Sequence, residues 1–143
     1  MPDKKVNINF SLLKIKTDQF VIFEENFFKN EKINLNTDLT FGLNLKDKVF
    51  LVTPKYTFEN NDKPFMAIQI SCFFKIEDST WKDFKNEKKI IFPKDFVAHM
   101  AMITVGTSRG ILHTKTEGST FNDYILPFLN VADIVSDDVS FDL

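Results

Sequence analysis

This chain has little of several residue types on which proteins commonly build binding and catalytic sites. Its one cysteine, Cys72, excludes an intrachain disulfide framework and a zinc site made of several cysteines. Its one arginine, Arg109, leaves almost no residue for bidentate recognition of phosphate or guanine. The formal net charge is −2, whereas proteins that bind nucleic acid usually carry a basic excess, so we expect no nucleic-acid partner.

Glycine and long apolar runs are also scarce. The glycines form neither a phosphate-binding loop nor a dinucleotide fingerprint; they are Gly42, Gly106, Gly110 and Gly118. No apolar run reaches the roughly 18 residues that span a bilayer, so we expect no membrane insertion. The first residues also lack the apolar stretch of a signal peptide, and we therefore predict a cytoplasmic protein.

The residues that could carry chemistry do not form a recognisable pattern. His99 and His113 are too far apart for two ligands on one helical face, and each is typical of a surface or partly buried histidine. Cys72 falls in the middle of an expected strand without a nucleophile motif around it, and Asp137 and Asp138 are typical of solvated surface. We expect no enzyme activity, no catalytic residue, no metal and no cofactor.

The length of the chain and the pattern of its apolar residues predict a single folded domain. Its 143 residues suit one domain over residues 1–143. Alternation of apolar and polar residues predicts four strands. The first covers residues 6–15, with a second piece at 20–23 beyond a turn at 17–19, and the others lie at 33–45, 49–58 and 65–76. The phase slips at Leu12 and Leu13, which predicts a β-bulge or a bend. Pro54 cannot donate a ladder hydrogen bond, which predicts an edge strand or a bulge there.

The second half has helical periodicity. A helix is expected to begin at Pro93 and to end near Leu112, and a shorter one to lie around Trp81 and Phe84. Short turns between the strands favour antiparallel pairing, in meander or Greek-key order. The predicted fold class is therefore α+β.

Phenylalanine is the one residue in excess, with 17 Phe against 2 Tyr and 1 Trp. Phe27 and Phe28 stand together among polar residues in a connection between strands. They could fold back to cap the core, or they could form part of a hydrophobic groove for extended polypeptide. The sequence alone leaves both interpretations open.

Three short motifs occur in order along the second half of the chain: Phe92-Pro93, Ser108-Arg109-Gly110, and Leu126-Pro127 followed by Asn130. With the four strands before them, they make the chain resemble the SecB family of protein-export chaperones. The resemblance covers nearly the whole chain. It implies a four-stranded antiparallel sheet with one long helix and a short or truncated C-terminal helix on one face, and a Ser-Arg-Gly motif at the end of the long helix.

The resemblance also implies a function. SecB-like proteins are ATP-independent holdases that bind unfolded or extended polypeptide in aromatic-lined grooves and are linked to protein export. By position, the groove residues would be Phe27, Phe28, Phe65, Tyr124 and Phe128. Asp18 and Glu24 match acidic residues that would contact the translocase motor ATPase.

The resemblance further implies a homotetramer, built as a dimer of dimers. Small and apolar residues of the long helix suit close contact between helices of two copies; they are Ala98, Ala101, Val105 and Ser108. The alternative is that these residues pack on the chain's own sheet.

Two other functions remain open at this stage. The chain could be a dedicated adaptor or chaperone of a single partner such as an antitoxin. It could also be a small-molecule-binding α+β domain, although convergent polar groups for such a ligand are missing.

Overall fold

The computed structural model describes residues 9–143, so the predicted strand start at residues 6–8 lies outside the described part. Its main element is a four-stranded antiparallel sheet with the spatial order β1-β4-β3-β2. The strands are β1 (Phe10–Ile22), β2 (Ile33–Asn44), β3 (Val49–Asn60) and β4 (Lys63–Ile76). This is Greek-key order, because β2, β3 and β4 are joined by hairpins and β1 lies beside β4. The predicted α+β class is confirmed.

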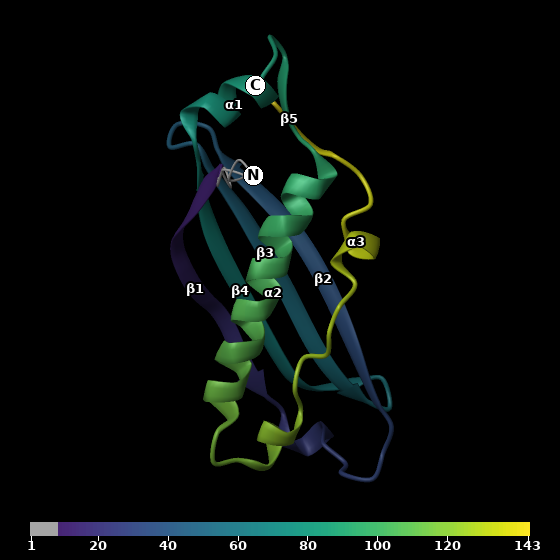
Figure 1. Ribbon diagram of the computed structural model, residues 1–143. Coiled ribbons are helices and arrows are strands. Elements are labelled where there is room, and N and C mark those ends of the chain that lie inside the picture. Colours follow the sequence, from purple (N-terminus) through teal and green to yellow (C-terminus); the bar gives the residue numbers. More distant parts are fainter. Residues whose placement is uncertain (1–8) are drawn as a thin grey trace, which may run out of the picture.

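The remaining elements follow the sheet or lie in its connections. They are η1 (Glu24–Asn26), α1 (Asp78–Phe84), β5 (Lys89–Phe92), α2 (Lys94–Thr116), η2 (Thr120–Asp123), α3 (Val131–Ile134) and β6 (Val139–Asp142). Figure 1 shows α2 crossing one face of the sheet, with the C-terminal segment running beside it on the β2 side. No helix of the described residues lies on the other face of the sheet, so the two faces have different environments.

The core lies between α2 and the sheet. Residues opposite each other on β3 and β4 share a face, and Phe50 opposite Phe74 is fully buried on the side of α2. From the helix, Met100 and Ala101 fill the space above them. Each large apolar side chain buried in this way stabilises the fold by roughly 1.5–3 kcal/mol.

Strand β1 is irregular at two points. Its register against β4 shifts between Leu12 and Lys14, which confirms the bulge predicted from the phase slip. A second shift lies between Thr17 and Gln19, where a turn was predicted. The chain does not turn there, because a bulge absorbs the extra residue and β1 continues to Ile22.

The position predicted for Pro54 is wrong, since β3 lies in the interior of the sheet. Pro54 pairs with Leu39 on β2, and the ladder to β4 has no paired residues between Val52 and Lys55, with no change of register. The missing N–H of Pro54 therefore leaves a local gap in the pairing of β3 with β4 and does not place β3 at the edge of the sheet. The Thr53 and Ser71 hydroxyls, 2.8 Å apart, bridge this gap.

The long helix α2 begins directly after Pro93, as predicted, and its first N–H is capped by the Asp138 carboxylate at 2.9 Å. It extends to Thr116, beyond the predicted end near Leu112, so Ser108-Arg109-Gly110 lies inside the helix and not at its end. The C-terminal helix α3 is a single turn, as the resemblance implies. The small sheet of β5 and β6 was not predicted, because four-residue strands carry too little alternation to be recognised.

Candidate polypeptide-binding surface

Five aromatic side chains meet where the β1–β2 connection, the start of β4 and η2 come together. The Phe27 ring centroid lies 5.0 Å from those of both Phe65 and Phe121, and 5.7 Å from that of Tyr124. Phe58 adds contacts at 6.2 Å to Phe65 and 6.4 Å to Tyr124. Because Phe65 is fully buried, this cluster belongs to the core and is not an open groove.

The adjacent rings Phe27 and Phe28 take different environments. Phe27 packs in the cluster, whereas Phe28 is 53% exposed. The connection that carries them is fixed to the β3–β4 turn: Asn26 donates to the Pro64 carbonyl at 2.8 Å, and the Phe28 N–H donates to the Asn60 side chain at 3.0 Å. The backbone of Phe28 is therefore held in place, and its ring faces outward.

A second exposed ring, Phe128, is positioned by the only arginine of the chain. Arg109 donates from Nε to the Leu126 carbonyl at 2.7 Å and from Nη2 to the Pro127 carbonyl at 2.8 Å. Its guanidinium also lies 5.3 Å from the centre of the Phe128 ring, within cation–π distance. Phe128 is 97% exposed, so its immediate support within the chain is this arginine.

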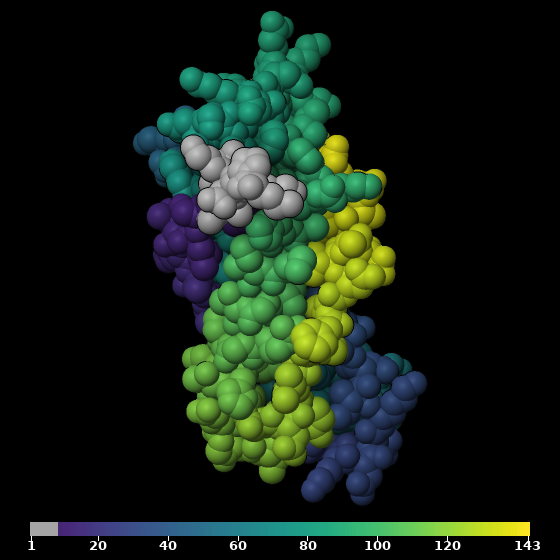
Figure 2. All heavy atoms as spheres, viewed as in Figure 1, coloured from purple at the N-terminus to yellow at the C-terminus, as the bar shows by residue number. Residues whose placement is uncertain are grey.

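Beside Phe128 the surface is hollowed between α2 and the C-terminal segment, which form adjoining bands in Figure 2. This α2 hollow has a volume of about 240 Å³. It is lined by Met102, Val105, Arg109, Phe128, Leu129 and Val131. The lining is apolar apart from the guanidinium, which suits an apolar side chain of an incoming polypeptide.

The aromatic residues predicted as a groove are thus divided among three places. Phe27, Phe65 and Tyr124 meet in the core cluster, Phe28 is exposed beyond it, and Phe128 lies at the α2 hollow. In residues 9–143, neither Phe28 nor Phe128 makes a ring contact with that cluster.

Sequence reasoning missed most of the hollow. Met102, Arg109, Leu129 and Val131 were not predicted to line a binding surface. Helical spacing could have placed Met102 on the same face as Gly106, but nothing in the pattern showed that this face is the open one.

The acidic residues predicted to meet a motor protein differ in availability. The second bulge of β1 places Asp18 on the helix-free face, where its carboxylate accepts hydrogen bonds from Ser71 and, at 3.3 Å, from Gln69. The Lys16 ammonium lies 3.9 Å from the Asp18 carboxylate. Glu24, in η1, is exposed. A contact of this pair with a motor protein stays a prediction.

The long helix presents a different face from the one expected to contact another copy. Ala101 and Ser108 are fully buried against the chain's own sheet, Val105 is nearly so, and only Ala98 is partly exposed. Ala101 and Ser108 therefore pack on the chain's own sheet, which was the alternative to a contact with another copy.

The open side of α2 carries Met102, Gly106 and Gly110 at helical spacing. Met102 is 61% exposed, and a Cβ placed on either glycine would meet nothing within 4 Å. The chain's own packing therefore gives no reason for two glycines inside a helix, where each costs about 1 kcal/mol relative to alanine.

The buried polar groups under α2 are unsuited to nucleophilic chemistry. Burial raises the pKa of the Cys72 thiol. Burial also raises the pKa of Tyr56 to about 12, although Ser108 and Arg109 partly oppose the shift. The Tyr56 hydroxyl has no hydrogen-bond partner among the described residues. Both groups are thus protonated near neutral pH and enclosed by the core.

We predict that Cys72 reacts with a thiol reagent such as dithionitrobenzoate at least about 100-fold more slowly than free cysteine, because burial disfavours the thiolate and blocks access. Unfolding in guanidinium should restore the rate. Rapid labelling of the native protein would show that α2 leaves the sheet readily.

Residues 9–143 contain neither a candidate metal site nor a candidate membrane-spanning helix. No group of three or more His, Cys, Asp or Glu side chains in this part of the chain could hold a metal ion. No helix in the same range is long and apolar enough to cross a bilayer.

No protein-family model matches this sequence, and no curated protein does. Among solved structures, the chain is similar to the SecB-like chaperone Rv1957 of Mycobacterium tuberculosis, solved in complex with a ChAD peptide from the Rv1956 HigA1 antitoxin. The TM-score is 0.51 at 10% identity, over 85% of this chain and 91% of that one. The fold is SecB-like.

A second solved structure, a protein of unknown function from Streptococcus agalactiae, has a TM-score of 0.41 at 15% identity, over 87% of this chain and 99% of that one. The similarity to the mycobacterial protein supports the SecB-like fold, and at 10% identity it concerns the fold alone. Function has to be argued from the residues of this chain.

Proposed function

We propose that this chain is an ATP-independent chaperone that holds non-native polypeptide on the surface formed by Phe28, Phe128 and the α2 hollow. The observation that carries the proposal is Phe128, an almost fully exposed aromatic ring on a segment whose Leu126 and Pro127 carbonyls accept hydrogen bonds from Arg109, with the guanidinium 5.3 Å from the ring centre. A phenylalanine ring left in water gains no burial free energy from the fold and would gain it on contact with an apolar side chain of a client. A fixed ring loses little entropy on contact with a client polypeptide, so it favours binding.

The binding that this surface supports is broad. The α2 hollow is small and largely apolar, so it can take one or two apolar side chains without demanding a particular sequence. Affinity would accumulate over several such contacts along an extended client. The chaperone would act in the cytoplasm before export, with Glu24 as the more available of the two acidic contacts for a translocase motor.

A dedicated chaperone of one partner is the second candidate. It is favoured by the antitoxin peptide bound to the structurally similar mycobacterial protein. Affinity purification from the native host separates the two: many clients in similar amounts support a general holdase, and one dominant partner supports a dedicated chaperone.

We propose that the protein assembles as a homotetramer from two sheet-paired dimers. Within residues 9–143, no strand pairs with the outer edge of the 13-residue strand β1, and Leu12 and Ile15 lie exposed beside this edge on the side of α2. An edge of this kind suits pairing with β1 of a second copy. Gly106 and Gly110 on the open side of α2 would then bring the helices of two dimers close together, with Met102 at the border between this contact and the α2 hollow.

Light scattering of a chemically denatured client diluted into buffer tests the holding function. We expect stoichiometric protein to suppress aggregation without ATP, and the double variant Phe28→Ser, Phe128→Ser to lose most of the effect while keeping its circular dichroism spectrum. Phe23→Ser, another exposed ring outside the proposed surface, is the matched control. Failure of the folded wild-type protein to suppress aggregation would refute the proposal.

A further inference from the structure

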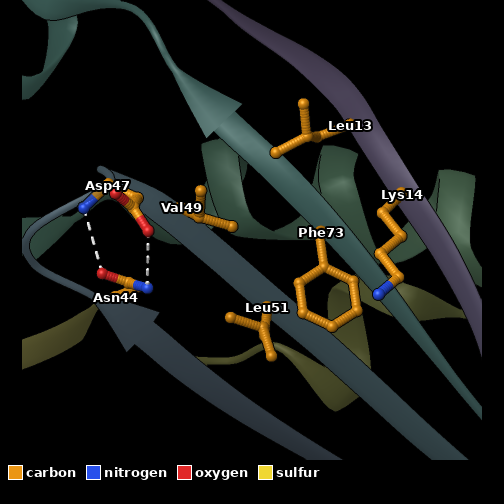
Figure 3. Close-up of a pocket in the computed structure, with 7 residues that line it drawn as sticks. All are labelled: Leu13, Lys14, Asn44, Asp47, Val49, Leu51 and Phe73. Carbon is orange, nitrogen blue, oxygen red and sulfur yellow. Dashed lines mark hydrogen bonds between the residues drawn. The ribbon is translucent and has the colours of Figure 1, made fainter.

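The helix-free face of the sheet has an apolar hollow at one end, on the opposite side from the proposed client surface. Most of this face is polar, with Thr53, Lys55, Thr57, Gln69 and Ser71 directed to it. Near the β2–β3 turn the character changes, and a hollow of about 400 Å³ opens over Val49, Leu51 and Phe73 (Figure 3). No helix within residues 9–143 covers these side chains, and none of the three belongs to the hydrophobic cluster under α2.

The first bulge of β1 builds one wall of this outer hollow. Leu13 is the inserted residue between Leu12 and Lys14, and the bulge brings Leu13 and Lys14 together onto the helix-free face. Leu13 is 61% exposed. Phe73 lies opposite Leu51 on the neighbouring strand, so the floor and wall come from three consecutive strands of the sheet.

The rim of the hollow carries an available positive charge. The Lys14 ammonium lies 5.5 Å from the centre of the Phe73 ring, and no carboxylate of residues 9–143 forms a salt bridge with it. Asp47, on the opposite rim, is engaged in its own turn: its carboxylate accepts from Asn44 at 3.1 Å, and its N–H donates to Asn44 at 3.0 Å.

A second cation reinforces this charge. Lys75 donates to the main-chain carbonyl of Asp47 and therefore holds its ammonium beside the hollow without pairing to a carboxylate there. Lys14, Lys75 and Asp47 together give the rim of the hollow a formal charge of +1, whereas the chain as a whole has a net charge of −2.

We propose that this outer hollow is a docking site for an extended acidic segment of a partner polypeptide. The segment would place a large apolar side chain against Leu13, Leu51 and Phe73, and a carboxylate at the Lys14 ammonium. The charge selects an acidic partner, and the open apolar floor selects a side chain rather than an isolated ion. If a second copy pairs along the β1 edge, the sheet is extended sideways and its helix-free face stays open. Docking at the outer hollow therefore goes beyond the proposed chaperone function and does not depend on it.

Fluorescence anisotropy with a labelled peptide tests the proposal on the full chain. The probe has a Leu-Phe centre flanked on both sides by Glu-Asp. One comparison peptide replaces the acidic residues with lysine, and a second replaces Leu-Phe with Ser-Ser. We expect saturable binding of the first peptide only, weakened by raising the salt concentration.

Two variants locate the site, and one controls for charge. Leu13→Asp and Lys14→Glu should each weaken binding at least about tenfold. Lys55→Glu makes the same charge change elsewhere on the same face and should leave affinity within about twofold. All three positions are at least partly exposed, so the fold should survive, which circular dichroism checks.

Several outcomes would overturn the proposal. They are no binding of the acidic peptide up to about 1 mM, equal binding of the lysine peptide, and affinity unchanged in Leu13→Asp. A change of sedimentation coefficient in Leu13→Asp without peptide would show that another copy of the chain covers the hollow instead.

Discussion

Replacing Ala101 with glutamate is expected to destabilise this chain strongly. Ala101 is fully buried between α2 and the sheet, beside Met100, where a carboxylate has neither water nor a cationic partner. An unpaired buried charge costs about 3–5 kcal/mol, a large part of the roughly 5–15 kcal/mol that stabilises a domain. The melting temperature should fall by roughly 10–20 °C, as thermal unfolding followed by circular dichroism would show.

The next residue gives the matched control. Met102→Glu makes a comparable change at an exposed position, so the melting temperature should stay within a few degrees. The proposed contact of two dimers through α2 adds a second expected result: Met102→Glu should split the tetramer into dimers and so halve the sedimenting mass. A stable Ala101→Glu variant that sediments as smaller particles would show that Ala101 contacts another copy and that α2 is not packed as described.

Replacing Arg109 with methionine is expected to reduce client binding about as much as removing the Phe128 ring itself. The substitution leaves the Leu126 and Pro127 carbonyls without their donors, and hydrogen bonds to a charged group are worth about 1.5–3 kcal/mol each. The segment that carries Phe128 should then become mobile, and the affinity for an unfolded client should fall at least about tenfold.

A double-mutant cycle separates positioning from general destabilisation. If Arg109 acts by holding Phe128, the combined variant Arg109→Met, Phe128→Ser should bind clients no more weakly than either single variant. Arg109→Lys should be intermediate, because an ammonium cannot reproduce the fork geometry toward two carbonyls. Ile125→Ser, exposed in the same segment but not lining the hollow, is the control. Full client binding by Arg109→Met would contradict the assigned role.

The sheet could be predicted because its determinants are local. Alternation at Ile33–Asn44 and the phase slip at Leu12 and Leu13 follow directly from the two-residue period of a strand with one buried face. Pro54 was misplaced because the sequence shows that an N–H is missing but not which neighbouring strand can do without it. That choice depends on tertiary pairing.

The candidate site was harder to predict because it depends on which face of α2 meets the sheet. Ala101 and Gly106 are both small and both lie on the same helix, yet one is in the core and the other is in the open. Likewise, nothing local distinguishes Phe27 from Phe28, whose environments depend on the hydrogen bonds of Asn26 and Asn60 to distant segments. The Ser-Arg-Gly motif drew attention to Arg109, but it did not predict the hydrogen bonds of Arg109 to the Leu126 and Pro127 carbonyls.

The most direct test of the chaperone proposal is a binding titration with a permanently unfolded client, such as a reduced and carboxymethylated protein, followed by fluorescence anisotropy without nucleotide. We predict saturable binding with a dissociation constant of about 10 μM or tighter, weakened at least about tenfold in the double variant Phe28→Ser, Phe128→Ser. Absence of binding by the folded wild-type chain, or equal affinity in the double variant, would contradict the account.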